Sequence, residues 1–314
     1  MKILVPDTIP LELDTSRDEL VHYDVTAPIP PAARDADVLV VWRNADENLR
    51  DAAALPGLRL VQTLAAGPDQ ILAAGFGPET VLASGRSLHD GPVAEHALAL
   101  VLAAVRRLDL LGTAQRDSRW DSDFLDAQRA PETEALYTLS GSRVTIWGFG
   151  SIAARLAPML AALGASVTGV AGSAGIRSGF PVVAAAELPA LLEQTDVLIS
   201  LLPASPETDK ALGADLLERL PRHAVFVNVG RGATVDEEAL VAALRAGRLR
   251  VAALDVTRAE PLPVDSELWS APNLLLTPHA AGNRPQNATA LVQESIDAAR
   301  EGRTVRNALE RTRV

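Results

Sequence analysis

The chain has no cysteine among its 314 residues, which excludes disulfide bonds, a thiolate nucleophile and any cysteine-based metal site. It also lacks an apolar run long enough to cross a membrane. Residues 1–10 lack the basic start and the long apolar core of a signal peptide. We therefore expect a cytoplasmic protein with no membrane partner, and we assign no metal ligands.

Positive charge is also scarce. Lys and Arg together number 29 against 40 Asp and Glu, and the formal net charge is −11. Lysine occurs only at Lys2 and Lys210, so arginine carries nearly all of the positive charge. An acidic chain repels the phosphate backbone, and we therefore expect no nucleic-acid partner.

What is present is an ordinary globular composition, 48% hydrophobic and 22% charged, in a chain long enough for about two domains. Helical patterns, among them 152–163, 213–220 and 236–246, alternate with short apolar runs, which predicts an α/β fold. The predicted strands are residues 2–6, 20–24, 38–42, 58–64, 81–84, 144–147, 166–170, 196–202, 224–229, 251–256 and 274–277.

The most informative stretch is 144–153, Val-Thr-Ile-Trp-Gly-Phe-Gly-Ser-Ile-Ala. A short apolar strand leads into Gly148 and Gly150, and an Ala-rich helix follows. Gly148 permits a sharp turn, Gly150 lets the backbone approach a pyrophosphate, and the helix N-terminus offers free N–H groups. Ala153 replaces the third glycine, which is an allowed variant. This pattern favours a dinucleotide site over a merely structural turn.

The second strand of such a site normally ends in Asp or Glu, which binds the ribose 2′-hydroxyl. Here residues 171–175 read Ala-Gly-Ser-Ala-Gly, and no carboxylate occurs before Glu187. Ser173 and Arg177 are the nearest groups that could meet a 2′-phosphate, although Arg177 could equally be solvated. The pattern therefore favours NADP slightly over NAD.

Residues 93–111 form a long, nearly all-apolar helical run after Pro92, which suits a first helical turn. A helix that is apolar on most faces is buried in a core or in a subunit interface. For His96, on this helix, a packing role is favoured over chemistry. Residues 112–140, with aromatic side chains scattered among charges, are typical of an extended arm or loop.

Polar groups follow three predicted strands. Arg231 lies between two glycines after one strand, Asp255 closes another with Glu260 five residues later, and His279 follows the last. Ligands in open α/β sheets lie beyond the carboxyl ends of strands, so these groups could converge on one site. An arginine fork suits a carboxylate or keto oxygen, and a histidine next to a glutamate suits proton transfer. Each residue alone could equally be a surface or core residue.

At these residues the chain resembles the D-isomer-specific 2-hydroxyacid dehydrogenase family, which includes phosphoglycerate, glycerate and hydroxypyruvate enzymes. The matching segments keep the family's order over most of 58–284 and are 93–98 (Val-Ala-Glu-His-Ala-Leu), 148–153, 202–208 (Leu-Pro-Ala-Ser-Pro-Glu-Thr), 227–232 (Val-Asn-Val-Gly-Arg-Gly), 254–261 and 276–279 (Leu-Thr-Pro-His). By this resemblance Arg231 binds substrate, Glu260 supports the histidine, and His279 is the acid–base. Asp255 is then expected near the nicotinamide amide.

The resemblance also implies a fold. A Rossmann domain, a doubly wound parallel sheet at 93–284, would be inserted into a smaller flavodoxin-like α/β substrate domain made of 1–92 and 285–314, with its last helix at about 284–301. The cleft between the two domains would close over substrate. Residues 93–140 would form the helix and arm of a homodimer. Two departures stand out: Pro68 lacks an N–H beside the substrate-carboxylate turn, and Ala171 replaces the ribose-binding acid.

The motifs and the resemblance together predict two sets of binding residues. Cofactor would be bound by Gly148, Phe149, Gly150, Ser151, Ile152, Gly172, Ser173, Arg177, Leu202, Pro203, Val229, Gly230, Asp255, His279 and Gly282. Substrate would be bound by Arg231, His279 and the backbone N–H groups of Ala65, Ala66 and Gly67, a turn for which a purely structural role is equally compatible with the sequence alone. Further substrate-pocket candidates are Trp42, Arg43, His89 and Arg284.

The expected activity is hydride transfer between NADP or NAD and a small 2-keto acid or (R)-2-hydroxy acid. Two alternatives remain open: a dinucleotide-sensing corepressor that does not turn over substrate, and a phosphite-type dehydrogenase. A formate dehydrogenase is disfavoured, because such enzymes replace the glutamate that stands here as Glu260.

Overall fold

The computed structural model describes residues 1–14 and 16–310, which fall into two compact units. Unit 1 comprises Met1–His89 and Asn283–Val314, and unit 2 comprises Asp90–Gly282. The two boundaries between the units lie three and two residues before those expected at 92/93 and 284/285. The first boundary is earlier because the first helix of unit 2 already begins at Asp90. Residues 311–314, the end of the predicted substrate domain, lie outside the described residues.

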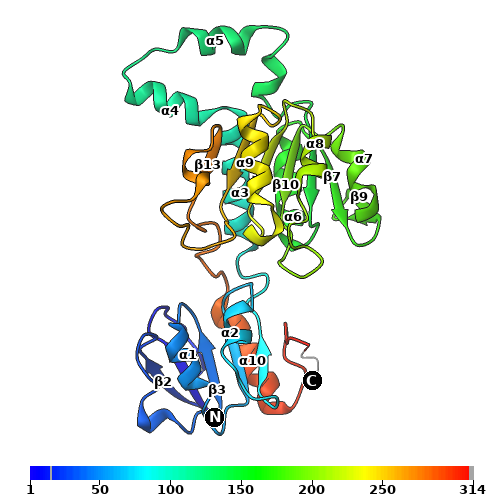
Figure 1. Cartoon of the computed structure of the whole chain (residues 1–314). Helices are drawn as coiled ribbons and strands as arrows, with labels where there is room; N and C mark the ends of the chain where they lie inside the picture. Colours follow the sequence, from blue (N-terminus) through cyan, green and yellow to red (C-terminus); the bar gives the residue numbers. More distant parts are fainter. Residues whose placement is uncertain (15, 311–314) are drawn as a thin grey trace. The chain divides into compact units, whose positions relative to one another are not determined.

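Unit 1 is a parallel sheet with helices on both faces (Figure 1). Its strand order, β2-β1-β3-β4-β5, is the flavodoxin-like order. The elements are β1 (Lys2–Pro6), β2 (Glu19–Tyr23), η1 (Pro31–Ala33), β3 (Val38–Val41), α1 (Asp46–Ala52), β4 (Leu60–Thr63), α2 (Asp69–Ala73), β5 (Val81–Ala83) and α10 (Ala288–Glu301).

The strands of unit 1 are buried on both faces, so alternate side chains enter different cores. Ile3 and Val5 pack with the helix α10, whereas Leu4 packs with residues of α1 and α2. Helix α10 is the last helix among the described residues and is bound to the sheet by a buried hydrogen bond from Ser295 Oγ to Gln62 Oε1 at 2.8 Å. The end of the chain thus completes the core begun by its first strand.

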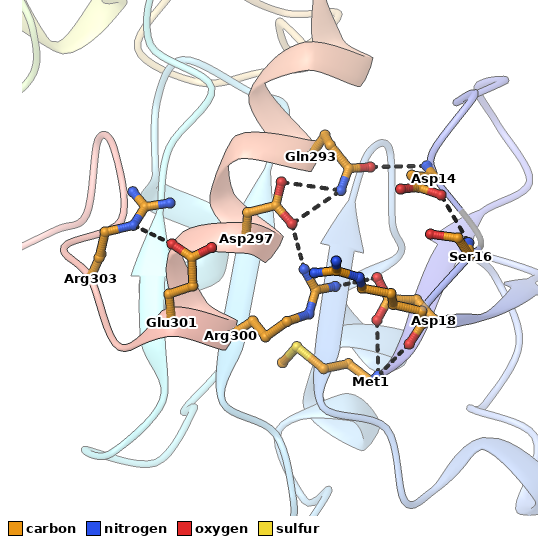
Figure 2. A network of polar contacts seen from close by, with 10 residues as sticks. Met1, Asp14, Ser16, Asp18, Gln293, Asp297, Arg300, Glu301 and Arg303 are labelled. Carbon is orange, nitrogen blue, oxygen red and sulfur yellow. Dashed lines mark hydrogen bonds and ion pairs between the residues drawn. The ribbon is translucent and has the colours of Figure 1, made fainter.

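A polar network ties the outer face of α10 to the N-terminal segment (Figure 2). Asp18, whose side chain is only 2% exposed, accepts hydrogen bonds from the Met1 α-amino group at 2.9 Å and from Arg300. Arg300 also pairs with Asp297, and Gln293 accepts a bond from the Asp14 N–H. Because Asp18 and α10 are far apart in sequence, this network forms only when unit 1 is folded.

Unit 2 contains an eight-stranded sheet in the order β13-β12-β11-β10-β6-β7-β9-β8 (Figure 1). All its strand pairs are parallel except β8–β9, and the order of β9, β7, β6, β10, β11 and β12 is the doubly wound Rossmann order. The elements are α3 (Asp90–Val105), α4 (Leu108–Arg116), α5 (Ser122–Arg129), η2 (Glu134–Tyr137), β6 (Arg143–Trp147), α6 (Ser151–Ala162), β7 (Ser166–Ala171), β8 (Gly175–Arg177), β9 (Phe180–Ala184), η3 (Ala185–Glu187), α7 (Leu188–Leu192), β10 (Val197–Ser200), α8 (Ala214–Arg219), β11 (Val225–Asn228), η4 (Gly232–Thr234), α9 (Glu237–Arg245), β12 (Val251–Leu254), η5 (Glu267–Ser270) and β13 (Leu274–Leu276).

Two hydrophobic cores flank this sheet. Helices α3 and α6 cover one face together with Val144 and Ile146, and α7, α8 and α9 cover the other together with Leu198 and Phe226. The α/β class, the Rossmann sheet and its flavodoxin-like companion, all expected from the sequence, are therefore confirmed.

The single helix predicted for 93–111 is wrong in its extent. Helix α3 ends at Val105, and Arg107 takes a left-handed backbone conformation with φ +53° before α4 begins. The Arg107 guanidinium bonds to Asp109 and to Asn273, 166 residues away, and these contacts hold the break. As expected, α3 is buried: Ala94, Ala97 and Val101 have no exposed surface.

Residues 106–138 form an arm, which we define as α4, α5, η2 and their connections. Figure 1 shows α4 and α5 extending away from the sheet of unit 2. The segment expected at 112–140 as an extended arm or loop is an arm that contains helices, and Asp121 caps α5 by accepting the Phe124 N–H at 3.1 Å. Phe124 packs edge-on against Tyr137, and the Arg250 guanidinium carbon lies 4.6 Å from the Tyr137 ring centroid. These contacts hold the carboxyl-terminal part of the arm against unit 2.

Within residues 1–14 and 16–310, no helix combines the length and the apolar character that crossing a bilayer requires.

Candidate functional site

The carboxyl ends of the unit 2 strands lie in one row. Trp147, Ser200, Asn228, Leu254 and Leu276 are register partners across β6, β10, β11, β12 and β13. The segments that follow these strands therefore start at the same edge of the sheet. This row carries the glycine turn, the Arg231 turn, Asp255 and His279.

The glycine turn after β6 fits a dinucleotide. Gly148 has φ +99°, and a Cβ there would lie 2.8 Å from the Leu201 carbonyl group. At Gly150 an added Cβ would have no heavy atom within 4 Å, so the backbone borders open space at this position. No side chain caps the N-terminus of α6, which begins directly after Gly150. Its first N–H groups, those of Ser151 and Ile152 among them, are thus placed for a pyrophosphate.

Phe149, between the two glycines, is buried against β7. The Gly169 position admits its ring only because it has no side chain, since a Cβ there would come within 2.2 Å of the ring. Phe149 thus contributes its backbone to the turn while its side chain anchors the turn to the sheet.

Arg177 links the glycine turn to the end of β7. Its Nη1 donates to the Phe149 carbonyl at 3.3 Å, and its Nη2 donates to Ser173 O at 3.1 Å and Ser173 Oγ at 3.0 Å. Gly172 and Ser173 are exposed directly after β7. This is the position where a dinucleotide fold binds the adenosine ribose. A guanidinium and a hydroxyl occupy it here in place of a carboxylate.

Arg231 is presented by a compact turn after β11. Asn228, which is fully buried, accepts the Gly230 N–H at 3.0 Å and donates to Arg231 O at 3.1 Å. The flanking glycines permit close packing, because a Cβ at Gly232 would lie 2.0 Å from the Thr257 carbonyl carbon. The Arg231 Nη1 donates to Gly230 O at 2.8 Å.

Glu260 and His279 form a hydrogen-bonded dyad. Glu260 Oε2 lies 2.6 Å from His279 Nδ1, and Glu260 Oε1 accepts the Thr257 N–H at 3.0 Å. The carboxylate thus binds the imidazole through Nδ1, which fixes the orientation of the ring. Both residues line a pocket of about 640 Å³, whose apolar walls are Pro261, Leu262, Trp269, Leu276 and Pro278.

The other predicted cofactor residues of unit 2 also lie at this edge. Leu202 and Val229 are buried, Pro203 is exposed, and Gly230 and Gly282 belong to the turns that carry Arg231 and His279. Asp255 is 1% exposed, and its carboxylate accepts bonds from the turn 277–281. Contact of these residues with a cofactor stays a prediction.

In unit 1 the turn 64–67 follows β4. The Ala65 N–H donates to Thr63 Oγ1 at 3.1 Å and is therefore already bonded within the protein. Binding of a carboxylate by this turn stays a prediction. His89 Nε2 lies 2.8 Å from Leu64 O, and the Trp42 ring stacks on His89 with centroids 5.5 Å apart. The two other pocket candidates, Arg43 and Arg284, are exposed.

Sequence reasoning missed several residues that shape this site. Asn228 orders the Arg231 turn, Thr257 positions Glu260, and Thr277 bonds to Asp255. Each lies within four residues of a predicted site residue and close to a strand end. For Asn228 the available signal was its short polar side chain, because such side chains commonly bond to nearby backbone at turns. Thr257 acts through its backbone N–H and Thr277 bonds a residue 22 positions away, so neither left a local signal.

Comparisons with known proteins identify the family. The model of the D-isomer specific 2-hydroxyacid dehydrogenase NAD binding domain matches residues 98–281. Glyoxylate/hydroxypyruvate reductase A of Klebsiella pneumoniae subsp. pneumoniae is 34% identical over 297 residues, which cover 89% of this chain and 88% of that protein.

Two solved structures resemble the whole chain. A D-isomer specific 2-hydroxyacid dehydrogenase family protein of Aeromonas salmonicida subsp. salmonicida matches with a TM-score of 0.82 and 27% identity, over 98% of each chain. The NADPH-dependent glyoxylate/hydroxypyruvate reductase of Sinorhizobium meliloti, in complex with NADP and sulfate, matches with a TM-score of 0.79 and 26% identity, over 98% of each chain. With a family model matching more than half of its residues, this chain belongs to the D-isomer-specific 2-hydroxyacid dehydrogenase family.

Proposed function

We propose that this protein reduces a small 2-keto acid to the corresponding 2-hydroxy acid with NADPH, and that glyoxylate and hydroxypyruvate are the first substrates to test. The observation that carries the proposal is the Glu260–His279 dyad, closed at 2.6 Å on the same sheet edge as the dinucleotide turn. The relatives that are glyoxylate/hydroxypyruvate reductases supply the substrate class.

His279 is the proposed acid–base. Glu260 accepts a hydrogen bond from the Nδ1–H group and thereby fixes the ring orientation and the tautomer. Nε2 then delivers a proton to the substrate oxygen in reduction and removes it in oxidation. A bound nicotinamide would supply the hydride in reduction and accept it in oxidation. Glu260 also stabilises the charge on the imidazole when it is protonated.

Two groups are proposed to bind the substrate acid. Arg231 offers a guanidinium fork to the carboxylate or keto oxygen, held by the ordered turn that Asn228 stabilises. Ala66 and Gly67 offer backbone N–H groups to the carboxylate, while Ala65 contributes only to the shape of the turn. Fixing the acid keeps the reacting atoms at contact distance.

NADP(H) is the proposed cofactor. Arg177 bonds simultaneously to the glycine turn and to Ser173, which brings a positive charge to the ribose position at the end of β7. Unit 2 thus serves as the dinucleotide-binding domain and unit 1 as the substrate domain.

A homodimer through α3 and the arm is also proposed. Leu108, Leu110 and Trp120 expose 52%, 41% and 85% of their surface on the arm, where apolar area gains stability by meeting a second copy of the chain.

The decisive test is the His279→Ala variant. We expect kcat with glyoxylate or hydroxypyruvate to fall by about 10²–10⁴-fold, while NADPH still binds, because one positioned acid–base is lost. The matched control is His22→Ala, which removes an exposed histidine on β2 and should leave kcat unchanged. Turnover of His279→Ala close to that of the wild type would reject the assignment.

The substrate class is tested by an absorbance screen of glyoxylate, hydroxypyruvate, pyruvate and longer 2-keto acids with NADH and NADPH in parallel. We expect glyoxylate and hydroxypyruvate to give the highest kcat/KM. Tight cofactor binding with negligible turnover of every acid would instead support a dinucleotide-sensing protein.

A further inference from the structure

His96 extends from α3 to the turn that carries His279. Its Nε2 lies 3.1 Å from Thr277 Oγ1 and 3.2 Å from Asp255 Oδ1, and its side chain is 24% exposed. The sequence favoured a packing role for this residue on an apolar helix. In the structure, however, His96 contacts Thr277, which precedes the proposed acid–base His279 by two residues.

The carboxylate near His96, that of Asp255, accepts several hydrogen bonds from the turn 277–281. Asp255 accepts hydrogen bonds from the Thr277 hydroxyl at 2.6 Å, the Ala280 N–H at 2.8 Å and the Ala281 N–H at 3.1 Å. Its backbone carbonyl also accepts the His279 N–H at 2.7 Å. Every bond in this set joins Asp255, at the end of β12, to the segment 277–281 that follows β13.

These hydrogen bonds stabilise a turn whose backbone conformation is unusual. His279 has φ +50°, a left-handed conformation that residues other than glycine adopt only when their surroundings hold them there. The ring bonded to Glu260 depends on that backbone for its direction. A small shift of Asp255 would therefore move His279.

Asp255 in turn needs a partner of its own. A carboxylate that is 1% exposed is stable only when hydrogen bonds or an opposite charge replace its lost water. Among the described residues, His96 is the basic side chain that pairs with it. Since the Thr277 hydroxyl donates to Asp255, Thr277 Oγ1 can accept a hydrogen bond from His96 Nε2, which also lies 3.2 Å from Asp255 Oδ1.

We propose that His96 is a positioning residue for the reaction: through Asp255 and Thr277 it fixes the turn 277–281 and thereby the direction of His279. This inference rests on the proposed role of His279. It assigns a function to the Ala-Glu-His segment of α3, and it makes the orientation of the acid–base depend on a helix about 180 residues earlier in the chain.

The test compares His96→Ala, His96→Gln and His223→Ala in the full-length protein. His223 is the matched control, because its Nε2 also bonds an aspartate, Asp196, at 2.9 Å, but at the amino-terminal end of β11. For His96→Ala we expect kcat to fall by about 10–100-fold, as misplacement of a reacting group by about 1 Å does, with KM for NADPH changed less than about twofold. His96→Gln, which keeps a donor near the Nε2 position, should recover most of kcat, and His223→Ala should match the wild type.

A second pair of variants covers the case in which His96→Ala does not fold. Thr277→Val removes the hydroxyl that joins His96 to Asp255 and keeps the side-chain shape, and Thr277→Ser keeps the hydroxyl. We expect Thr277→Val to lose kcat as His96→Ala does, and Thr277→Ser to retain it. In both affected variants the solvent deuterium isotope effect on kcat should rise, because proton transfer becomes more rate-limiting.

The inference is overturned if His96→Ala lowers kcat no more than His223→Ala, if His96→Gln is as impaired as His96→Ala, or if Thr277→Val is indistinguishable from Thr277→Ser. These outcomes differ from failure of the proposed function. An active His279→Ala variant rejects the acid–base assignment itself, whereas an inactive His279→Ala beside a fully active His96→Ala rejects only the positioning role.

Discussion

At the scale of single residues, the departure with the clearest consequence is the one at the end of β7. Ala171 stands where a ribose-binding acid is common, and Arg177 reaches back from the β8–β9 hairpin to Ser173 and Phe149. The guanidinium therefore comes from a residue well beyond the strand end. Its bonds to the protein orient it, so little side-chain freedom remains to be lost when an anion binds.

Arg177→Ala should raise KM for NADPH by about 10–100-fold and leave KM for NADH nearly unchanged, because a charge-assisted hydrogen bond to a 2′-phosphate contributes about 1.5–3 kcal/mol. Steady-state kinetics with both cofactors measure this. Arg222→Ala is the control, since Arg222 is exposed in the same unit and bonds only to Gly247 O among the described contacts. A wild-type enzyme that prefers NADH, or equal losses with both cofactors, contradicts the proposal.

At the scale of elements, the attachment of α10 to the N-terminal segment depends on a buried charge network. Burial by itself raises the pKa of Asp18, but hydrogen bonds from the Met1 α-amino group and Arg300 lower it by more, so the pKa of Asp18 lies below its ordinary value. The ionised form is therefore bound more favourably in the folded state. Its stabilising contribution is present above the unfolded pKa and is lost as pH falls through the folded pKa.

Asp18→Asn should therefore lower Tm at neutral pH, and the difference from the wild type should shrink as pH falls below about 4. Thermal unfolding followed between about pH 3 and pH 8 measures it. Glu12→Gln, an exposed acid on the same segment, is the control and should follow the wild type throughout. A difference in Tm that persists unchanged to the acid end would show that Asp18 does not act through its charge.

At the scale of the whole molecule, the chain is a nicotinamide-dependent 2-hydroxyacid dehydrogenase by family, and its arm exposes three large apolar side chains, Leu108, Leu110 and Trp120. Trp120 is 85% exposed between α4 and α5. In a two-fold dimer each interface residue is used twice, so one substitution counts double.

Trp120→Asp should therefore convert the proposed dimer to monomer at micromolar concentration. Loss of about 2 kcal/mol from each of two buried tryptophans weakens association by roughly 10³-fold. Sedimentation velocity across a concentration series measures it. Val264→Asp, at a position 96% exposed in a loop of the same unit, is the control and should leave the assembly unchanged. A wild-type protein that sediments as a monomer, or a Trp120→Asp dimer as stable as the wild type, contradicts the proposal.

Local signals made much of this molecule predictable. Eleven of the thirteen strands of the described residues, the glycine turn and the α/β class depend on the side-chain pattern and on backbone conformation over a few residues, and these were predicted correctly. The short strands β8 (Gly175–Arg177) and β9 (Phe180–Ala184) were not predicted. The helix expected at 93–111 failed because Arg107 adopts a left-handed conformation that Asn273 helps to hold. A contact spanning 166 residues leaves no mark in the local apolar pattern.

The sequence by itself determined the class of fold and which strand ends carry polar groups, because both follow from short-range chemistry. Only the tertiary structure decided how those groups are used. It showed that the Ala65 N–H is taken by Thr63, that Arg177 turns back to the glycine turn, and that His96 meets Asp255. Hydrogen bonds act over about 3 Å, and residues far apart in sequence come within that range only when the chain has folded.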